Sequence, residues 1–298
     1  WAAIIMMIAL FAMIAFVTNL CSPMATIVKN QFGASELAGQ IGNYANFIAY
    51  LVMGIPSGML IAKLGYKKTA LLALIVGIVG IVFEYLSGVV GSYVIYLVGA
   101  FISGLCMCML NTVVNPLLNV LGGGGKTGNQ LIQIGGAANS AAAVAVYILM
   151  GALIGEVTKS TGISDATPAL IIAGVIFVIA FVILLFTKIE EPEQAKVELS
   201  LITGALKFRQ LSLGALAIFL YMSVEVGTPT YMISYLQTPE VGLSAGVAGL
   251  IASVYWLMMF VGRSIGGSIG GKVSSRAMVS TVATAAIALL LFGIFAPE

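Results

Sequence analysis

The chain has 298 residues, of which 60% are hydrophobic and only 8% are charged. An ordinary soluble domain has roughly 25% charged residues, so a water-soluble globule is excluded, because its surface could not be covered with groups that water solvates. The net charge of +2, from 13 Lys and Arg and 11 Asp and Glu, gives no indication of a nucleic-acid partner. We therefore predict an integral membrane protein in contact with lipid.

The residue types that most enzymes use for catalysis and metal binding are scarce. The sequence has no His, and its three Cys, which are Cys21, Cys106 and Cys108, lie in apolar runs where we expect small buried side chains. A His-dependent catalytic triad is excluded, and a His/Cys metal site lacks ligands. We therefore expect no enzymatic activity, no metal and no cofactor, since no nucleophile and base form a recognisable pair.

Long apolar runs predict nine membrane-spanning helices, since about 18 or more apolar residues can cross a bilayer. Two of the runs contain one acid each, Glu84 in the third and Glu225 in the seventh. The expected helices are residues 2–28, 38–62, 69–87, 92–121, 129–155, 167–187, 210–237, 245–271 and 277–296.

The basic residues of the loops predict the orientation of these helices. Loops after the even-numbered helices carry ten Lys and Arg residues, whereas loops after the odd-numbered helices carry only Lys29 and Lys159. Positively charged loops stay on the cytoplasmic side, so we expect a cytoplasmic N-terminus and a multi-pass protein of the cytoplasmic membrane. Arg263, near the cytoplasmic end of the eighth helix, agrees with this orientation.

A charged stretch and an internal repeat predict two similar halves. Residues 188–209 form the expected cytoplasmic linker between a six-helix bundle, 1–187, and the first three helices of a second bundle, 210–298. Small residues four apart recur in 54–62 and 262–270, in helices that have the same orientation. We therefore expect about three further helices beyond the present chain, with a nine-helix protein as the alternative.

A glycine-bracketed segment and a short basic turn connect the second and third helices. Its marker residues are Gly58, Lys63, Gly65, Lys67 and Lys68. This segment resembles the cytoplasmic signature loop of the major facilitator superfamily, although Ala62 stands where that loop usually has Asp. The resemblance implies an all-α membrane protein with two six-helix bundles that work by alternating access.

Three segments carry a closer resemblance to the fucose/galactose/glucose:proton symporter family. They are Ile55 to Lys67, the run from Asn111 to Gly122 followed by 129–133, and Tyr221 to Val226. The resemblance implies a neutral hexose or deoxyhexose as substrate and a proton or other cation as the coupling ion. Two acids of that family align with Ser22 and Asn111, and neither of these residues can carry a proton. A sugar uniporter without ion coupling is therefore an open alternative, and we expect a monomer in the lipid membrane.

Asparagines of the fourth helix are candidate sugar ligands. Asn111, Asn115 and Asn119 are spaced i, i+4 and i+8 and share one face. Their amides suit a hydroxyl-rich neutral solute, but such residues also form polar contacts between packed helices. Both interpretations stay open for Asn111 and Asn115, and we expect a structural role for Asn119.

The fifth and first helices supply further candidates. Gln133 matches a Gln of the symporter family's sugar site, Gln130 lies one turn away, and Asn139 follows among small residues. Asn19 aligns with a polar position of the same site. We expect Asn19, Gln130 and Gln133 to converge at mid-depth. Such a cluster would argue against the alternative of a non-transporting receptor or scaffold subunit.

The seventh helix has one polar stripe. Tyr221, Glu225, Thr228 and Tyr235 recur at i, i+4, i+7 and i+14, and Pro229 frees a backbone carbonyl. Tyr221 and Thr228 are candidate sugar ligands. Glu225 is the candidate coupling carboxylate and also a candidate acceptor for sugar hydroxyls, while the structural alternative is a pair with a Tyr or Arg.

In the eighth helix, Trp256 is a candidate for stacking on a sugar ring, with a lipid-facing position as the alternative. We expect Arg263 to hold helices together at the cytoplasmic end, and Gly262 and Gly266 to allow close helix packing. Glu84 is expected to be structural or interfacial. The stripe of Asn43, Asn46 and Tyr50 in the second helix is expected to pack between helices or line a gate.

Overall fold

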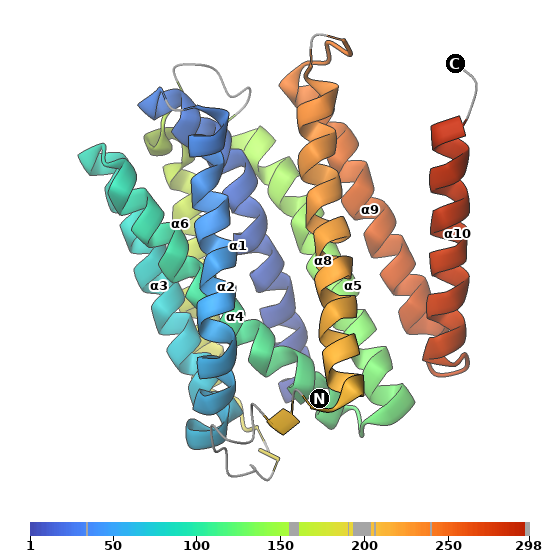
Figure 1. Ribbon diagram of the computed structural model, residues 1–298. Coiled ribbons are helices and arrows are strands. Elements are labelled where there is room, and N and C mark those ends of the chain that lie inside the picture. The colour runs from blue at the N-terminus through green and yellow to red at the C-terminus, as the bar shows by residue number, and fades with distance from the viewer. Residues whose placement is uncertain are drawn as a thin grey trace.

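The computed structural model describes residues 1–33, 35–154, 161–189, 191–192, 204–205, 207–238 and 240–295. Within these residues the chain is all-helical, and nine of its helices are long and apolar enough to cross a membrane (Figure 1). The helices are α1 (Ala2–Phe32), α2 (Glu36–Leu64), α3 (Tyr66–Val90), α4 (Tyr93–Leu121), α5 (Gly125–Ile154), α6 (Thr167–Phe186), α8 (Arg209–Leu236), α9 (Ala245–Ile269) and α10 (Ser275–Phe295).

The nine predicted spans are present, with ends that differ by a few residues. α1 continues to Phe32 because the next residue, Gly33, adopts a left-handed conformation with φ of 58° that ends the helix. Ser35 accepts a hydrogen bond from the Ala38 N–H at 3.2 Å and so caps the start of α2. A 3-10 helix, η1 (Ile163–Ala166), precedes α6 and was not predicted. Most of the predicted linker 188–209 lies outside the described residues.

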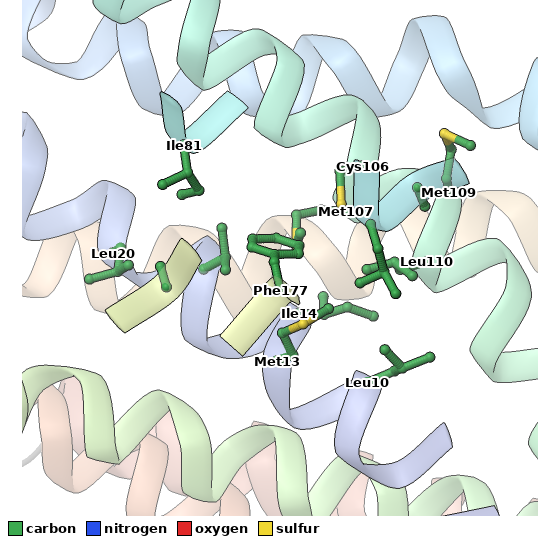
Figure 2. Packing of buried hydrophobic residues seen from close by; sticks show 14 of the residues in the cluster. Leu10, Met13, Ile14, Leu20, Ile81, Cys106, Met107, Met109, Leu110 and Phe177 are labelled. Carbon is green, nitrogen blue, oxygen red and sulfur yellow. The ribbon is translucent and has the colours of Figure 1, made fainter. Parts of the chain in front are cut away.

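α1 to α6, here called the N-terminal group, enclose an apolar core. Met13 and Ile14 of α1, Leu110 of α4 and Phe177 of α6 are all buried there, as Figure 2 shows. The three cysteines are also buried and free, as predicted. A Cβ on Gly77 of α3 would meet the Phe177 ring and Cys106 Sγ, so this close approach of α3, α4 and α6 requires glycine.

α8, α9 and α10, here called the C-terminal group, bury much less of their surface. None of the residues of α10 is buried, and Figure 1 shows this helix apart from the others. α9 packs against both α5 and α8. The face of α9 toward the rest of the protein buries Ala252, Trp256 and the Gly266–Gly267 pair. The α5–α9 interface is therefore where the two groups of helices meet.

Candidate functional site

The α5–α9 interface is closely packed at the end of the molecule where α1 begins. A Cβ on Gly266 would lie 3.7 Å from Gln133 Cδ, and one on Gly271 would lie 3.4 Å from Gln130 Oε1. Gln133 therefore lies against Gly266 of α9, and Gln130 lies against Gly271, two residues after the end of α9. At Gly266, where close packing was predicted, a Cβ would make only ordinary van der Waals contacts, and a Cβ on Gly262 would meet nothing within 4 Å.

About one helical turn deeper, Arg263 of α9 reaches across to α5. Its Nη1 donates to Ser140 Oγ at 2.9 Å, to the Gly136 carbonyl at 3.1 Å and to Asn139 Oδ1 at 3.4 Å. Asn139 in turn donates from Nδ2 to the Phe11 carbonyl of α1 at 2.9 Å. The Arg263 guanidinium therefore binds α5 directly, and Asn139 connects this contact to α1.

The same guanidinium binds the polar stripe of α8. Arg263 Nη2 lies 2.9 Å from Glu225 Oε1 and 3.2 Å from the Tyr221 hydroxyl. The side chains of Arg263 and Glu225 are only 20% and 10% exposed. Charged pairs at this depth are costly unless their hydrogen-bonding groups are paired, and here Arg263 finds acceptors on both α5 and α8. Of the roles left open by the sequence for Glu225, an ion pair with Arg is present, and the coupling role stays a prediction.

The predicted free carbonyl of α8 is found at Glu225. Pro229 has no N–H to donate to the carbonyl four residues before it. That carbonyl belongs to Glu225 and accepts a hydrogen bond from the Tyr255 hydroxyl of α9 at 3.2 Å. Glu225 therefore binds α9 through its backbone as well as through its carboxylate.

Trp256 lies between the two groups of helices. It is 9% exposed and packs with Ala15 of α1 and Ala143 of α5, with the Tyr255 ring edge-on at 5.6 Å. The lipid-facing alternative is therefore wrong. Its Nε1 is buried and has no hydrogen-bond partner among the described residues. Such an unpaired donor is the kind of group that a ligand oxygen can satisfy.

Asn19 lies one helical turn beyond Ala15, the residue of α1 that packs against Trp256. It is 8% exposed and donates to the carbonyl of Ala15, which packs against Trp256, at 2.8 Å. Gln133 is ten residues before Ala143 on α5, or about 15 Å along the helix axis at 1.5 Å per residue. The expectation that Gln130 and Gln133 converge with Asn19 is therefore wrong. Helical spacing within one chain segment does not fix how far a neighbouring helix is shifted along its axis.

The other candidates are spread over the protein. Asn111 Nδ2 donates to the Tyr50 hydroxyl of α2 at 2.9 Å, and Asn115 Nδ2 donates to the Asn111 carbonyl at 3.0 Å, so both amides make contacts within the N-terminal group. Asn119 donates to Asn129 at 3.2 Å. Thr228 and Tyr235 are exposed on α8, away from the Arg263 contacts.

At the signature loop, the structure shows a contact that sequence reasoning missed. The Glu191 carboxylate accepts hydrogen bonds from the backbone N–H groups of Tyr66 at 2.9 Å and Lys67 at 3.0 Å. A Cβ on Gly65, whose φ is 88°, would meet this carboxylate. A linker acid therefore caps the start of α3, four residues after Ala62. The acidic composition of the linker was visible in the sequence, but its docking position was not.

Comparison with known proteins matches this architecture to transporters. A glucose/galactose transporter of Brucella abortus is 25% identical over 263 residues, which cover 86% of this chain and 64% of that protein. An L-fucose-proton symporter of Escherichia coli is 22% identical over 314 residues, covering 97% of this chain and 72% of that protein. The crystal structure of the E. coli fucose:proton symporter superposes with a TM-score of 0.82 at 21% identity, covering 99% of this chain and 77% of that chain.

The chain thus spans a little under two thirds of the length of the glucose/galactose transporter that it matches. A second crystal structure, of the superfamily transporter FucP in the outward conformation, gives a TM-score of 0.83 at 20% identity. The family model described as Major Facilitator Superfamily matches residues 6–298. The helical multi-pass architecture and this match together show that the chain belongs to the Major Facilitator Superfamily, a family of membrane transporters.

Proposed function

We propose that the chain is part of a secondary transporter that moves a neutral monosaccharide across the cytoplasmic membrane by alternating access. The observation that carries the proposal is the buried indole of Trp256 between the two groups of helices, with an unpaired Nε1. The names of the relatives, a glucose/galactose transporter and an L-fucose-proton symporter, support a sugar as the substrate.

The surroundings of Trp256 suit a sugar. The apolar face of a pyranose stacks on an aromatic ring, and a hydroxyl oxygen can accept from the indole N–H. Leaving a buried donor unpaired costs about 1–3 kcal/mol, so a sugar oxygen in that place would remove the cost. Asn19 lies one helical turn beyond Ala15, within the same region of α1. We assign Asn19 and Trp256 to the sugar, and Asn139 and Tyr221 to positioning Arg263.

The α5–α9 contacts close the protein at one end, and alternating access requires that such an end can open and close. They run from Gln130 through Gln133 to Arg263, at the end where α1 begins, which the basic loops predict to be cytoplasmic. Opening that end requires the Arg263 contacts to α5 to break while the contact to Glu225 keeps α8 and α9 together. We propose that the structure represents the state closed toward the cytoplasm.

Coupling to a proton would act on the same contacts. A proton on Glu225 would remove the negative charge that holds Arg263 and weaken the cluster. The uniport alternative is favoured by Ser22 and Asn111 at the family's acidic positions. In proteoliposomes of the full-length protein, Glu225→Gln should abolish sugar accumulation driven by a pH gradient and preserve counterflow. Wild-type counterflow without any response to a pH gradient, and an unchanged rate in Glu225→Gln, would show uniport.

The sugar site is tested by tryptophan substitutions and a panel of radiolabelled hexoses and deoxyhexoses. Trp256→Ala should weaken binding at least tenfold, and Trp256→Phe should weaken it less, because an aromatic ring remains although it is smaller than the indole and has no N–H. Trp1→Phe, at a residue that is 91% exposed, is the matched control and should bind normally. Unchanged binding in Trp256→Ala would contradict the assignment, and a folded wild type that neither binds nor transports any sugar would favour the scaffold alternative.

A further inference from the structure

A second buried acid lies away from the α5–α9 interface, inside the N-terminal group. Glu84 of α3 is 7% exposed, and its Oε1 accepts a hydrogen bond from Ser103 Oγ of α4 at 2.8 Å. Its neighbours along α3, such as Ile81, belong to the apolar core. The sequence led us to expect only a structural or interfacial role for it.

Small residues of α3 and α4 make room for this carboxyl. A Cβ on Gly99 would lie 2.8 Å from Glu84 Cγ, and a Cβ on Gly80 would meet Ser103 Oγ. The Ser87 hydroxyl donates to the Glu84 backbone carbonyl at 2.6 Å. The two helices therefore pack closely around the Glu84 and Ser103 side chains. A residue larger than glycine at position 80 or 99 would collide with Ser103 or Glu84.

No cation faces Glu84 among the residues that the structure describes. The titratable side chains that interact with it are Cys21 of α1 and Tyr96 of α4, both of which are uncharged in their ordinary forms. α6, which also packs on α3, has no charged residue, and the charged residues of α2, Glu36 and Lys63, lie at its two ends. Glu225, by contrast, is paired with Arg263.

An acceptor in the same part of the bundle lacks a donor. Asn46 of α2 is fully buried, and its Oδ1 has no hydrogen-bond partner in the described part of the chain. Its Nδ2 lies 3.5 Å from Cys21 Sγ, and its backbone lies against Gly104 of α4, the residue after Ser103. Buried polar groups are normally paired, so Asn46 Oδ1 is an acceptor that a further donor could satisfy.

We propose that Glu84 is a proton-binding site within the N-terminal group, separate from the Arg263–Glu225 pair. A carboxylate buried without a cation costs several kcal/mol, whereas the neutral acid avoids that cost and adds a donor to this part of the bundle. Ser103 orients the carboxyl through Oε1. The binding step is protonation, in which an O–H bond of a hydronium ion breaks as its proton forms an O–H bond to a carboxylate oxygen, and a water molecule is released. The site stands on the geometry of α3 and α4 and does not depend on sugar transport.

Infrared spectroscopy of the purified full-length protein tests the site. The wild type at pH 7 should show the carbonyl stretching band of a protonated carboxylic acid, which should shift in D₂O. Glu84→Gln should lose this band, and Glu240→Gln, at an exposed acid, should keep it. A band that persists unchanged in Glu84→Gln, or a wild type without one, would overturn the proposal.

Two further measurements keep the test decisive. Ser103→Ala removes the hydrogen bond to Oε1, so it should shift the band without abolishing it, even if Glu84→Gln does not fold. Loss of the band when choline is replaced by sodium would overturn the proposal in favour of a metal-ion site. None of these readouts needs a sugar, so a failure of the proposed transport function would be recognised separately by the absence of sugar uptake.

Discussion

The N-terminal and C-terminal groups of helices bury different kinds of residues. In α4, Met107, Leu110 and Leu118 are completely buried among apolar neighbours. In α8, the buried residues among those whose side chains are described are Glu225 and Pro229, and Glu225 contacts α9 through both its carboxylate and its carbonyl. The N-terminal group is therefore held by apolar packing, whereas the contacts of α9 to it combine the packing of Trp256 with the hydrogen bonds of Arg263.

This difference suits a protein whose two groups of helices move against each other. Apolar packing is dense and changes shape only at a cost, so the N-terminal group can move as one body. Hydrogen bonds such as those of Arg263 can be exchanged for bonds to water or to a ligand at a smaller net cost. If the two groups move against each other as proposed, the contacts that change are those at the α5–α9 interface.

The largest effect should come from opening a cavity in the N-terminal core. Phe177→Ala removes a fully buried ring next to Gly77 and should lower the free energy of unfolding by about 3–5 kcal/mol. Phe292→Ala is the matched control on α10, where the ring is 72% exposed, and should change stability by less than about 0.5 kcal/mol. Denaturant unfolding of the purified protein measures both, and equal effects would contradict the difference between the groups.

A smaller effect is expected from the ion pair. Arg263→Ala and Glu225→Ala each remove one side of a charge-assisted hydrogen bond, and a double-mutant cycle should give a coupling of about 2 kcal/mol. Spin labels on α8 and α9 should show a wider distance distribution in either single variant. The double variant leaves no buried charge unpaired, so it should be more stable than additivity predicts. A coupling near zero would show that the ion pair does not help to hold α8 and α9 together.

The sequence predicted the helices well because a span needs only a long apolar run, which is a local property. It also predicted the free carbonyl near Pro229, because proline acts on the residue four positions before it. It did not predict that Arg263 binds α5, or that Gln133 lies far from Asn19. Periodicity shows which residues share a face of one helix, but contacts between helices depend on how each is shifted and tilted, which core packing determines.

The smallest predicted effect concerns the backbone contact between α8 and α9. Tyr255→Phe removes the donor to the Glu225 carbonyl and should cost about 1 kcal/mol of unfolding free energy. In a Pro229→Ala background, residue 229 regains an N–H that can satisfy the same carbonyl within the helix, so Tyr255→Phe should then cost close to nothing. Tyr231→Phe, at a ring that is 77% exposed on α8, is the control and should be neutral in both backgrounds.

The two backgrounds separate the hydroxyl of Tyr255 from its ring. The ring packs edge-on against Trp256, and phenylalanine keeps that contact. If Tyr255→Phe costs the same with Pro229 and with Ala at position 229, the hydroxyl does not act through the Glu225 carbonyl. If the cost disappears only with Ala at 229, a proline in α8 creates the acceptor by which α9 is held. The attachment of α8 to α9 would then depend on a missing hydrogen bond within α8 as well as on the charge of Glu225.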